Sequence, residues 1–273
     1  MDIIATIGQS TAYNLHSHTQ FCDGHATMEQ MVESALAAGM EHYGFSPHSP
    51  VPIESPCNMQ ATDVPLYLDE VARLRHKYGP EGIQLYASME IDYLGEEWGP
   101  AHPYFRTLGL DYTIGSVHFI PNQEGVWVDI DGKFESFKAK MSRMFHNDIR
   151  YVVDTYYAQS IKMVEAGGLD IVGHFDKVGH NAGHLCPGIE LEPWYEQHVH
   201  DLIDLIASKK VVAELNTKAW EGHHRMFPNT RYLRRVLQRG IPLIVNSDAH
   251  HPHLITAGRA EGFRQLHEAA SML

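Results

Sequence analysis

Short apolar runs recur along the chain, and polar residues bound each of them. The runs are rich in β-prone residues and too short for helices, which is typical of strands buried in a sheet. We therefore predict strands at 13–17, 42–47, 84–91, 111–117, 170–173, 211–215 and 241–247.

Helical patterns lie between these runs. In the first, apolar residues recur at helical spacing from Met28 to Leu36, with Thr27 as a candidate N-cap and Gly39 as a stop. Strands that alternate with helices predict a parallel sheet built from right-handed crossovers, which a barrel and an open doubly wound sheet both satisfy. The other predicted helices are 64–78, 97–108, 134–166, 193–209, 230–239 and 258–271.

The composition is that of an ordinary globular α/β protein. A length of 273 residues with 44% hydrophobic and 20% charged residues permits one domain, so we take 1–273 as a single domain. No apolar run approaches the ~18 residues of a membrane span, and the N-terminus lacks a basic region followed by a hydrophobic one. The odd number and wide spacing of Cys22, Cys57 and Cys186 suit a reducing compartment, so we expect a cytoplasmic protein without a membrane partner.

Two features of the charge balance narrow the function. The formal net charge of −13 disfavours a nucleic-acid partner, because phosphate backbones are bound by clustered Lys and Arg. The chain also has 20 His, nearly as many as its 21 Lys and Arg together. Since His is the commonest metal ligand and the usual acid or base near neutral pH, the positions of these residues matter.

The predicted strands end in side chains that can bind metals. The ends read NLHSH, FSPH, SMEID, GSVH, VGHFD, ELNT and NSDAH, so all but one finish in His, Glu or Asp, and the remaining one in Asn216. In parallel α/β folds, ligands bind at the carboxyl ends of the strands. We therefore expect these side chains to converge on one site.

Two pairs with i, i+2 spacing are the first ligand candidates. His16 and His18 leave the same face of a predicted strand, where two imidazoles can bind one metal; the alternative is a core His with a satisfied hydrogen bond. Asp248 and His250 repeat the spacing after IPLIV, and a carboxylate beside an imidazole suits zinc, manganese or iron. The alternative for Asp248 is a helix N-cap.

Single residues at other strand ends extend the set. A buried carboxylate at Glu90 would be costly without a cation, and a bridging position between two metals would remove that cost; the alternative is a surface Glu. His118 and His174 are further imidazole candidates of the same kind.

One histidine pair lies outside the strand ends. His180 and His184 have four-residue spacing, but Gly183 and Pro187 argue against a regular helix. We therefore expect no second metal site there.

Six ordered segments carry a specific resemblance, which covers about residues 13 to 251. Together they resemble the motifs of the polymerase and histidinol phosphatase (PHP) superfamily, and most closely those of its histidinol-phosphate phosphatases. The segments are HSHTQFCDG from His16, GFSPH ending at His48, the Met-Glu strand end at Glu90, GSVH ending at His118, GHFD around His174, and SDAH ending at His250.

The resemblance implies a distorted (β/α)7 TIM-like barrel with a trinuclear site for zinc, manganese or iron. Asp23 matches the family position in the first motif, with His25 as a competitor, and Pro47 replaces an Asp that often precedes the His48 position. The implied ligand sets are His16, His18, Glu90 and Asp248 for one ion, Glu90, His118 and His174 for the second, and Asp23, His48 and His250 for the third.

The implied activity is hydrolysis of L-histidinol phosphate to L-histidinol and phosphate in histidine biosynthesis. Water activated between metals would attack phosphorus, and Asp248 would pass a proton to the leaving oxygen. For the phosphate we expect a clamp of Arg150 and Lys218 with Asn216 as a polar contact, and Lys177 as a weaker candidate. The alternative for these cations is an exposed salt bridge.

Two other functions stay open. One is hydrolysis of a different small phosphate monoester or a nucleotide by the same site. The other is a metal-binding scaffold without catalysis, which the intact ligand set argues against. The sequence leaves the native metal and the oligomeric state undetermined.

Overall fold

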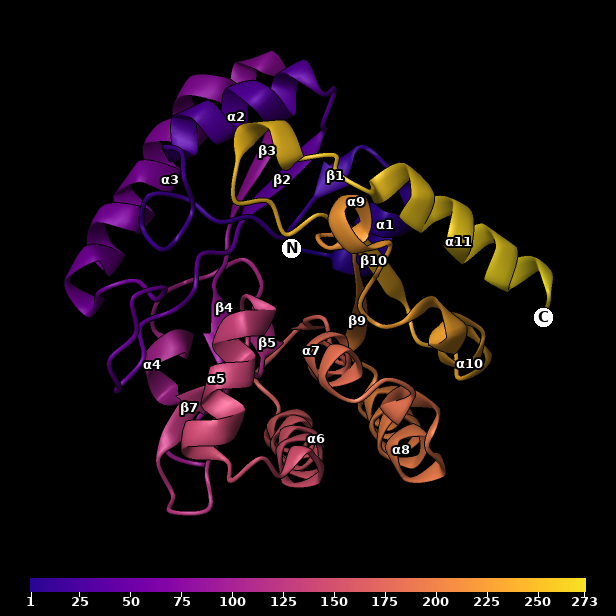
Figure 1. Cartoon of the computed structure of the whole chain (residues 1–273). Helices are drawn as coiled ribbons and strands as arrows, with labels where there is room; N and C mark the ends of the chain where they lie inside the picture. Colours follow the sequence, from indigo (N-terminus) through magenta and orange to yellow (C-terminus); the bar gives the residue numbers. More distant parts are fainter.

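The computed structural model describes residues 1–273, and its parallel strands lie in two sheets (Figure 1). The first sheet has the order β1-β2-β3, with β1 at Tyr13–Asn14, β2 at His42–Phe45 and β3 at Gln84–Ala87. The second has the order β10-β9-β8-β5-β4, and its strands are Leu243–Asn246, Val212–Asn216, Ile171–Val172, Ile114–Ser116 and Glu90–Asp92 respectively.

Only isolated bridges join the two sheets. Ser17 pairs with Ala249 beyond the ends of β1 and β10, and His48 pairs with Glu90 between the β2 segment and β4. The predicted parallel α/β architecture is therefore confirmed, whereas a continuous closed barrel is not. The predicted strand 84–91 forms two strands instead of one. Its first part, β3, pairs with β2 in the first sheet, and its second part, β4, pairs with β5 in the second.

Several helices form where local sequence signals predicted them. The first predicted helix forms as α2 (Met28–Ala37), with Thr27 and Gln30 in a reciprocal capping box. The remaining α-helices are α1 Ile3–Gln9, α3 Val64–Tyr78, α4 Pro103–Arg106, α5 Phe134–Met144, α6 Ile149–Ala166, α7 Val178–Leu185, α8 Pro193–Lys209, α9 Trp220–His223, α10 Leu233–Gln238 and α11 Arg259–Ser271.

Three helical segments differ from their predictions. The predicted helix 134–166 breaks into α5 and α6, because His146 and Asn147 take left-handed backbone angles (φ 51° and 60°). Only a single turn, α4, forms within 97–108. A regular helix, α7, does form around His180, because Gly183 lies in its last turns and Pro187 follows its end.

The structure also contains an antiparallel hairpin that was not predicted from the sequence. It consists of β6 (Phe119–Pro121) and β7 (Trp127–Asp129) and follows directly on His118. Its strands are short and do not alternate strongly, so their pattern carries little signal. The hairpin matters because it forms one wall of the cavity described below.

Helices cover the outer faces of both sheets. Figure 1 shows α2 and α3 over the first sheet, and α6 and α8 packed side by side below the second. Separate apolar clusters fill these interfaces, the larger between the second sheet and α5 to α8. No helix has both the length and the apolar character needed to cross a membrane, and the three Cys are unpaired.

Candidate metal centre

All of the predicted metal ligands gather at the carboxyl ends of the parallel strands. Except for Asp23 and Glu90, each lies two to four residues after the end of a strand, and Glu90 begins β4 at the bridge to His48. All but Asp23 and His250 are buried. The ligands are His16, His18, Asp23, His48, Glu90, His118, His174, Asp248 and His250.

Glu90 lies at the centre of this cluster, and its side chain is 1% exposed. The alternative of a surface glutamate is therefore wrong. Ser116 Oγ donates a hydrogen bond of 2.6 Å to Glu90 Oε1. The ring nitrogens that face its two oxygens are His174 Nε2 at 2.8 Å, His16 Nε2 and His48 Nδ1 at 3.2 Å, and His18 Nε2 and His118 Nε2 at 3.5 Å.

Asp248 forms a second centre of negative charge. Its Oδ1 lies 3.0 Å from His18 Nε2 and 3.3 Å from Lys218 Nζ, and its Oδ2 accepts a hydrogen bond of 3.1 Å from Asn216 Nδ2. Neither oxygen caps a helix, so the N-cap alternative is wrong. The backbone of Asp248 has φ 50°, a left-handed conformation that Asp tolerates better than most residues.

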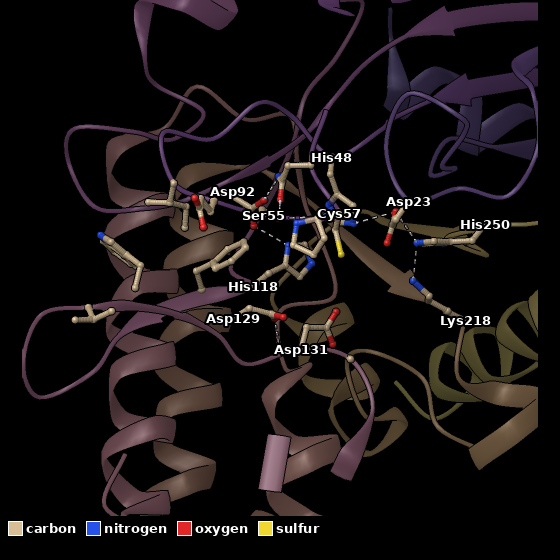
Figure 2. Close-up of a pocket in the computed structure, with 18 of the residues that line it drawn as sticks. Asp23, His48, Ser55, Cys57, Asp92, His118, Asp129, Asp131, Lys218 and His250 are labelled. Carbon is tan, nitrogen blue, oxygen red and sulfur yellow. Dashed lines mark hydrogen bonds and ion pairs between the residues drawn. The ribbon is translucent and has the colours of Figure 1, made fainter. Parts of the chain in front are cut away.

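Asp23 and His250 complete the outer side of the cluster (Figure 2). Asp23 Oδ1 lies 3.3 Å from His250 Nε2 and 3.7 Å from His48 Nε2. The competitor His25 is exposed and stacks on the ring of His251, so it does not reach the cluster. The structure thus brings Asp23, and not His25, to the other ligands.

The donor atoms fit bound metal ions. Several buried atoms have no hydrogen-bond partner, including His16 Nε2, His18 Nε2 and His48 Nδ1, and such atoms are costly unless something binds them. Imidazoles with carboxylates suit zinc, manganese or iron. Sets whose donor atoms all lie within 4.8 Å of one another are His18, Asp23, His48 and His250; His16, His18 and Asp248; and His48, Glu90 and His118.

Electrostatics support the same conclusion. Burial alone would lower the pKa of His16, but the carboxylates of Glu214, Asp248 and Glu90 raise it well above its usual value. Burial likewise opposes the charge on His118, whereas Glu90 and Asp92 raise its pKa to about 9. The buried carboxylates therefore require positive charge beside them, which a divalent ion provides.

Two carboxylates that hold ligand rings were missed from the sequence. Glu214 Oε1 lies 2.7 Å from His16 Nδ1, and Asp92 Oδ1 lies 2.7 Å from His118 Nδ1. Each accepts a ring N–H and so directs the opposite ring nitrogen toward the cluster. Period-two spacing could have found both, because Glu214 shares a strand face with Asn216, and Asp92 with Glu90.

Glu214→Gln tests this support. We expect metal affinity to fall by roughly 10–100-fold, since a neutral amide holds the His16 ring less firmly and lowers its basicity. Competition with a chromophoric chelator measures the affinity. Glu165→Gln, at an exposed position on α6, is the matched control. Equal affinity in Glu214→Gln and the wild type would show that Glu214 does not support the ligand.

The predicted phosphate-binding residues have three different placements. Lys218 lies at the edge of the cluster, with Nζ 3.3 Å from His250 Nε2. Asn216 is buried behind Asp248 and serves to hold that carboxylate. Arg150 does not reach the site: it is half exposed on α6, paired with Asp154 at 2.8 Å and stacked over the Trp194 ring. The exposed salt bridge is therefore the correct reading of Arg150.

Lys177 lies closer to the cluster than expected. Its Nζ is 2.7 Å from Asp131 Oδ2, and its side chain is 13% exposed. Burial alone would lower the pKa of Lys177, but Asp131, Asp248 and Glu90 raise it above its usual value. Lys177 is therefore a permanent cation beside the metal ligands.

A cavity of about 640 Å³ opens beside the cluster (Figure 2). Candidate ligands line one side, whereas the β6–β7 hairpin and the 53–58 loop line the other. Glu54, Asp129 and Asp131 contribute carboxylates to this second side. The cavity thus combines metal ligands, a lysine and an acidic wall.

Comparisons with known proteins agree with this geometry. The family model described as the PHP domain matches residues 14–218. A Deinococcus radiodurans protein named probable histidinol-phosphatase is 27% identical over 263 residues, which cover 93% of this chain and 92% of the relative. A Schizosaccharomyces pombe protein of the same name is 24% identical over 88% of this chain and 81% of its own.

Two solved structures show the same fold. A candidate histidinol phosphatase from Listeria monocytogenes aligns with a TM-score of 0.80 at 19% identity, covering 91% of this chain and 99% of that one. The histidinol phosphate phosphatase of Lactococcus lactis, complexed with zinc, L-histidinol and phosphate, aligns with a TM-score of 0.73 at 17% identity. That alignment covers 94% of this chain and 93% of the other.

Proposed function

The chain belongs to the PHP domain family, and on this premise we propose that it is a metal-dependent histidinol-phosphate phosphatase. The reaction is hydrolysis of L-histidinol phosphate to L-histidinol and phosphate. The observation that carries the proposal is the cluster of imidazoles around Glu90 at the wall of a substrate-sized cavity. The names of the two curated relatives and the ligands of the Lactococcus lactis structure support this substrate.

The proposed cofactors are three divalent ions of zinc, manganese or iron. The donor sets around Asp248, Glu90 and Asp23 support three positions. When bound, such ions lower the pKa of water and neutralise charge on a phosphoryl group.

The chain's own cations would hold the phosphate. Lys218 Nζ lies beside Asp248 and His250 and lines the cavity, so we assign it the contact with a phosphate oxygen. Lys177 adds a second positive charge but is held by Asp131, so it makes the electrostatic potential of the site more positive without contacting the phosphate. Lys177 thus takes the place of Arg150 in the expected phosphate clamp, and Lys218 keeps its expected role.

Asp248 is the proposed proton carrier. Burial alone would raise the pKa of Asp248, but Lys218, His16 and His18 hold it well below its usual value. The carboxylate is therefore ionised in the resting site. A proton that Asp248 passes to the leaving oxygen would come from the attacking water, which loses it as its oxygen bonds to phosphorus. Lys218, whose Nζ is 3.3 Å from Asp248 Oδ1, keeps the charge that holds the phosphate.

The acidic wall of the cavity suits the rest of the substrate. Histidinol carries an ammonium group and an imidazole, which gain from nearby carboxylates. Glu54 offers such a group at the cavity wall, whereas Asp129 on the same wall is already paired with Lys140 at 2.8 Å. Neutral or anionic alcohols lack this attraction, so the wall favours histidinol over other leaving groups.

We also propose that residues 1–273 act as one domain in which the two sheets form a distorted barrel. The bridge between Ser17 and Ala249 places the first and last strand segments side by side. The bridge between His48 and Glu90 links the sheets at the other edge. The ligands from both sheets could then share one site.

The test combines metal analysis with turnover. Freshly purified protein should hold about three metal ions per chain in the Glu90 cluster and release phosphate from histidinol phosphate. Chelation should abolish turnover, because bound ions activate the attacking water and neutralise charge on the phosphoryl group. Adding zinc or manganese should restore turnover. Faster turnover of nucleotides in a phosphate panel would favour the nucleotidase alternative. Tight metal binding without phosphate release from any compound would favour the scaffold.

A further inference from the structure

A second histidine cluster lies outside the Glu90 site. His180 and His184 come from α7, and His223 ends α9. One ligand atom of each lies within 4.8 Å of the others. The ring centroids are 4.6 Å apart for His180 and His184, and 4.7 Å apart for His180 and His223.

The local structure prepares these rings to bind a cation. Because α7 is a regular helix, its i, i+4 pair shares one face. His184 Nδ1 donates a hydrogen bond of 2.7 Å to the His180 carbonyl oxygen, which leaves the Nε2 lone pair of His184 free. The rings of His180 and His223 have no hydrogen-bond partner in the protein. A cation can therefore bind all three without breaking an existing contact.

The local charges permit a cation at this position. Burial disfavours the protonated form of His180, and the unprotonated imidazole is the form that binds metals. The nearby Arg225 guanidinium is neutralised by Asp176 at 3.0 Å and Glu190 at 2.8 Å.

We propose that His180, His184 and His223 bind a divalent transition-metal ion, with zinc as the natural candidate, at a site separate from the Glu90 cluster. Three imidazoles with a fourth position left open form a known zinc arrangement, and imidazole also suits copper and nickel. The histidines line a cavity of about 500 Å³, which leaves space for water as the fourth ligand.

Binding there would connect two segments that support the Glu90 site. Helix α7 follows β8 and His174, whereas α9 follows β9, which carries Glu214. An ion held by both helices would tie the loops after these strands together. The expected consequence is higher thermal stability, since a ligand that binds only the folded state stabilises it.

The experiment compares zinc content in single variants. Wild type, His184→Ala, His223→Ala and the control His267→Ala are loaded with zinc and dialysed against zinc-free buffer before metal analysis. His184, His223 and His267 are all exposed, so these substitutions should not disturb folding. We expect His184→Ala and His223→Ala to hold one zinc fewer per chain than the wild type and His267→Ala. Turnover of histidinol phosphate should stay within about twofold of wild type, in line with the small effects of exposed substitutions.

A second readout is spectroscopic. Because copper binds imidazole sites more tightly than zinc, Cu²⁺ added to the zinc-loaded protein should exchange into this exposed site and give an electron paramagnetic resonance signal with nitrogen couplings from imidazole. This signal should be weaker or changed in His223→Ala and unchanged in His267→Ala. Equal zinc content in all four proteins, or an unchanged copper signal in His223→Ala, would overturn the proposal. Neither result depends on which phosphate the Glu90 site hydrolyses.

Discussion

Glu90→Gln is expected to lower kcat/KM for histidinol phosphate by about 10³-fold or more and to remove much of the bound metal. Glu90 presents its two oxygens to the rings of His16, His18, His48, His118 and His174. A Gln amide keeps the shape but removes the negative charge and turns an N–H toward ring nitrogens. Loss of metal activation costs several kcal/mol of transition-state stabilisation, and each 1.36 kcal/mol is tenfold in rate.

Metal content and steady-state kinetics on the same preparation measure this effect. Glu97→Gln is the matched control, since Glu97 is exposed and makes no hydrogen bond or ion pair with any ligand. The control should keep wild-type metal and turnover. A Glu90→Gln protein that retained both would show that Glu90 does not hold the metals together.

Asp248→Asn should produce the second large effect, a fall in kcat of roughly 10²–10⁴-fold, the usual range for loss of a general acid or base. Asn matches Asp in size and also tolerates the left-handed backbone at this position, where φ is 50°. The Asn216 contact to Oδ2 can persist, whereas the charge opposite His18 and Lys218 is lost. The substitution therefore tests the carboxylate and not the fold.

The kinetic pattern separates two contributions of Asp248. A fall in kcat with metal content retained would identify proton transfer as the main contribution, whereas loss of zinc would identify metal binding. Asp69→Asn, at an exposed position on α3, is the control and should behave as wild type. Full activity in Asp248→Asn would contradict the assignment of this residue.

Helix positions could be predicted where local chemistry decides them. The patterns at 64–78 and 193–209 match α3 and α8 residue for residue, because apolar spacing and a proline near the start of each act within a few turns. The pattern at 134–166 failed, since only the backbone angles of His146 and Asn147 separate α5 from α6. The apolar spacing does not record such a break.

Strand pairing was harder to predict than strand position. Residues 84–91 were predicted as one strand, yet Gln84–Ala87 joins one sheet and Glu90–Asp92 joins the other. Which neighbour a strand finds depends on contacts distant in sequence. The sequence therefore indicated parallel strands without showing where the sheet divides.

The ligand candidates could be recognised because His, Asp and Glu at the ends of buried strands usually face a ligand-binding site. Their motifs pointed to Asp23, and the fold placed its competitor His25 on the surface. Arg150 was wrongly chosen, because a cation near a motif in the chain can face solvent on a helix. The sequence could not show that Lys177 pairs with Asp131, because the two residues lie 46 positions apart in the chain.

The amino-acid sequence by itself determined the alternation of strands and helices and the presence of metal-binding side chains at strand ends, since both follow from local periodicity. Only the tertiary structure decided which carboxylate orients which ring, as with Glu214 and His16, and which histidines meet, as with His180 and His223. These contacts join residues many positions apart. Their distances arise from how strands and helices pack, which no local pattern specifies.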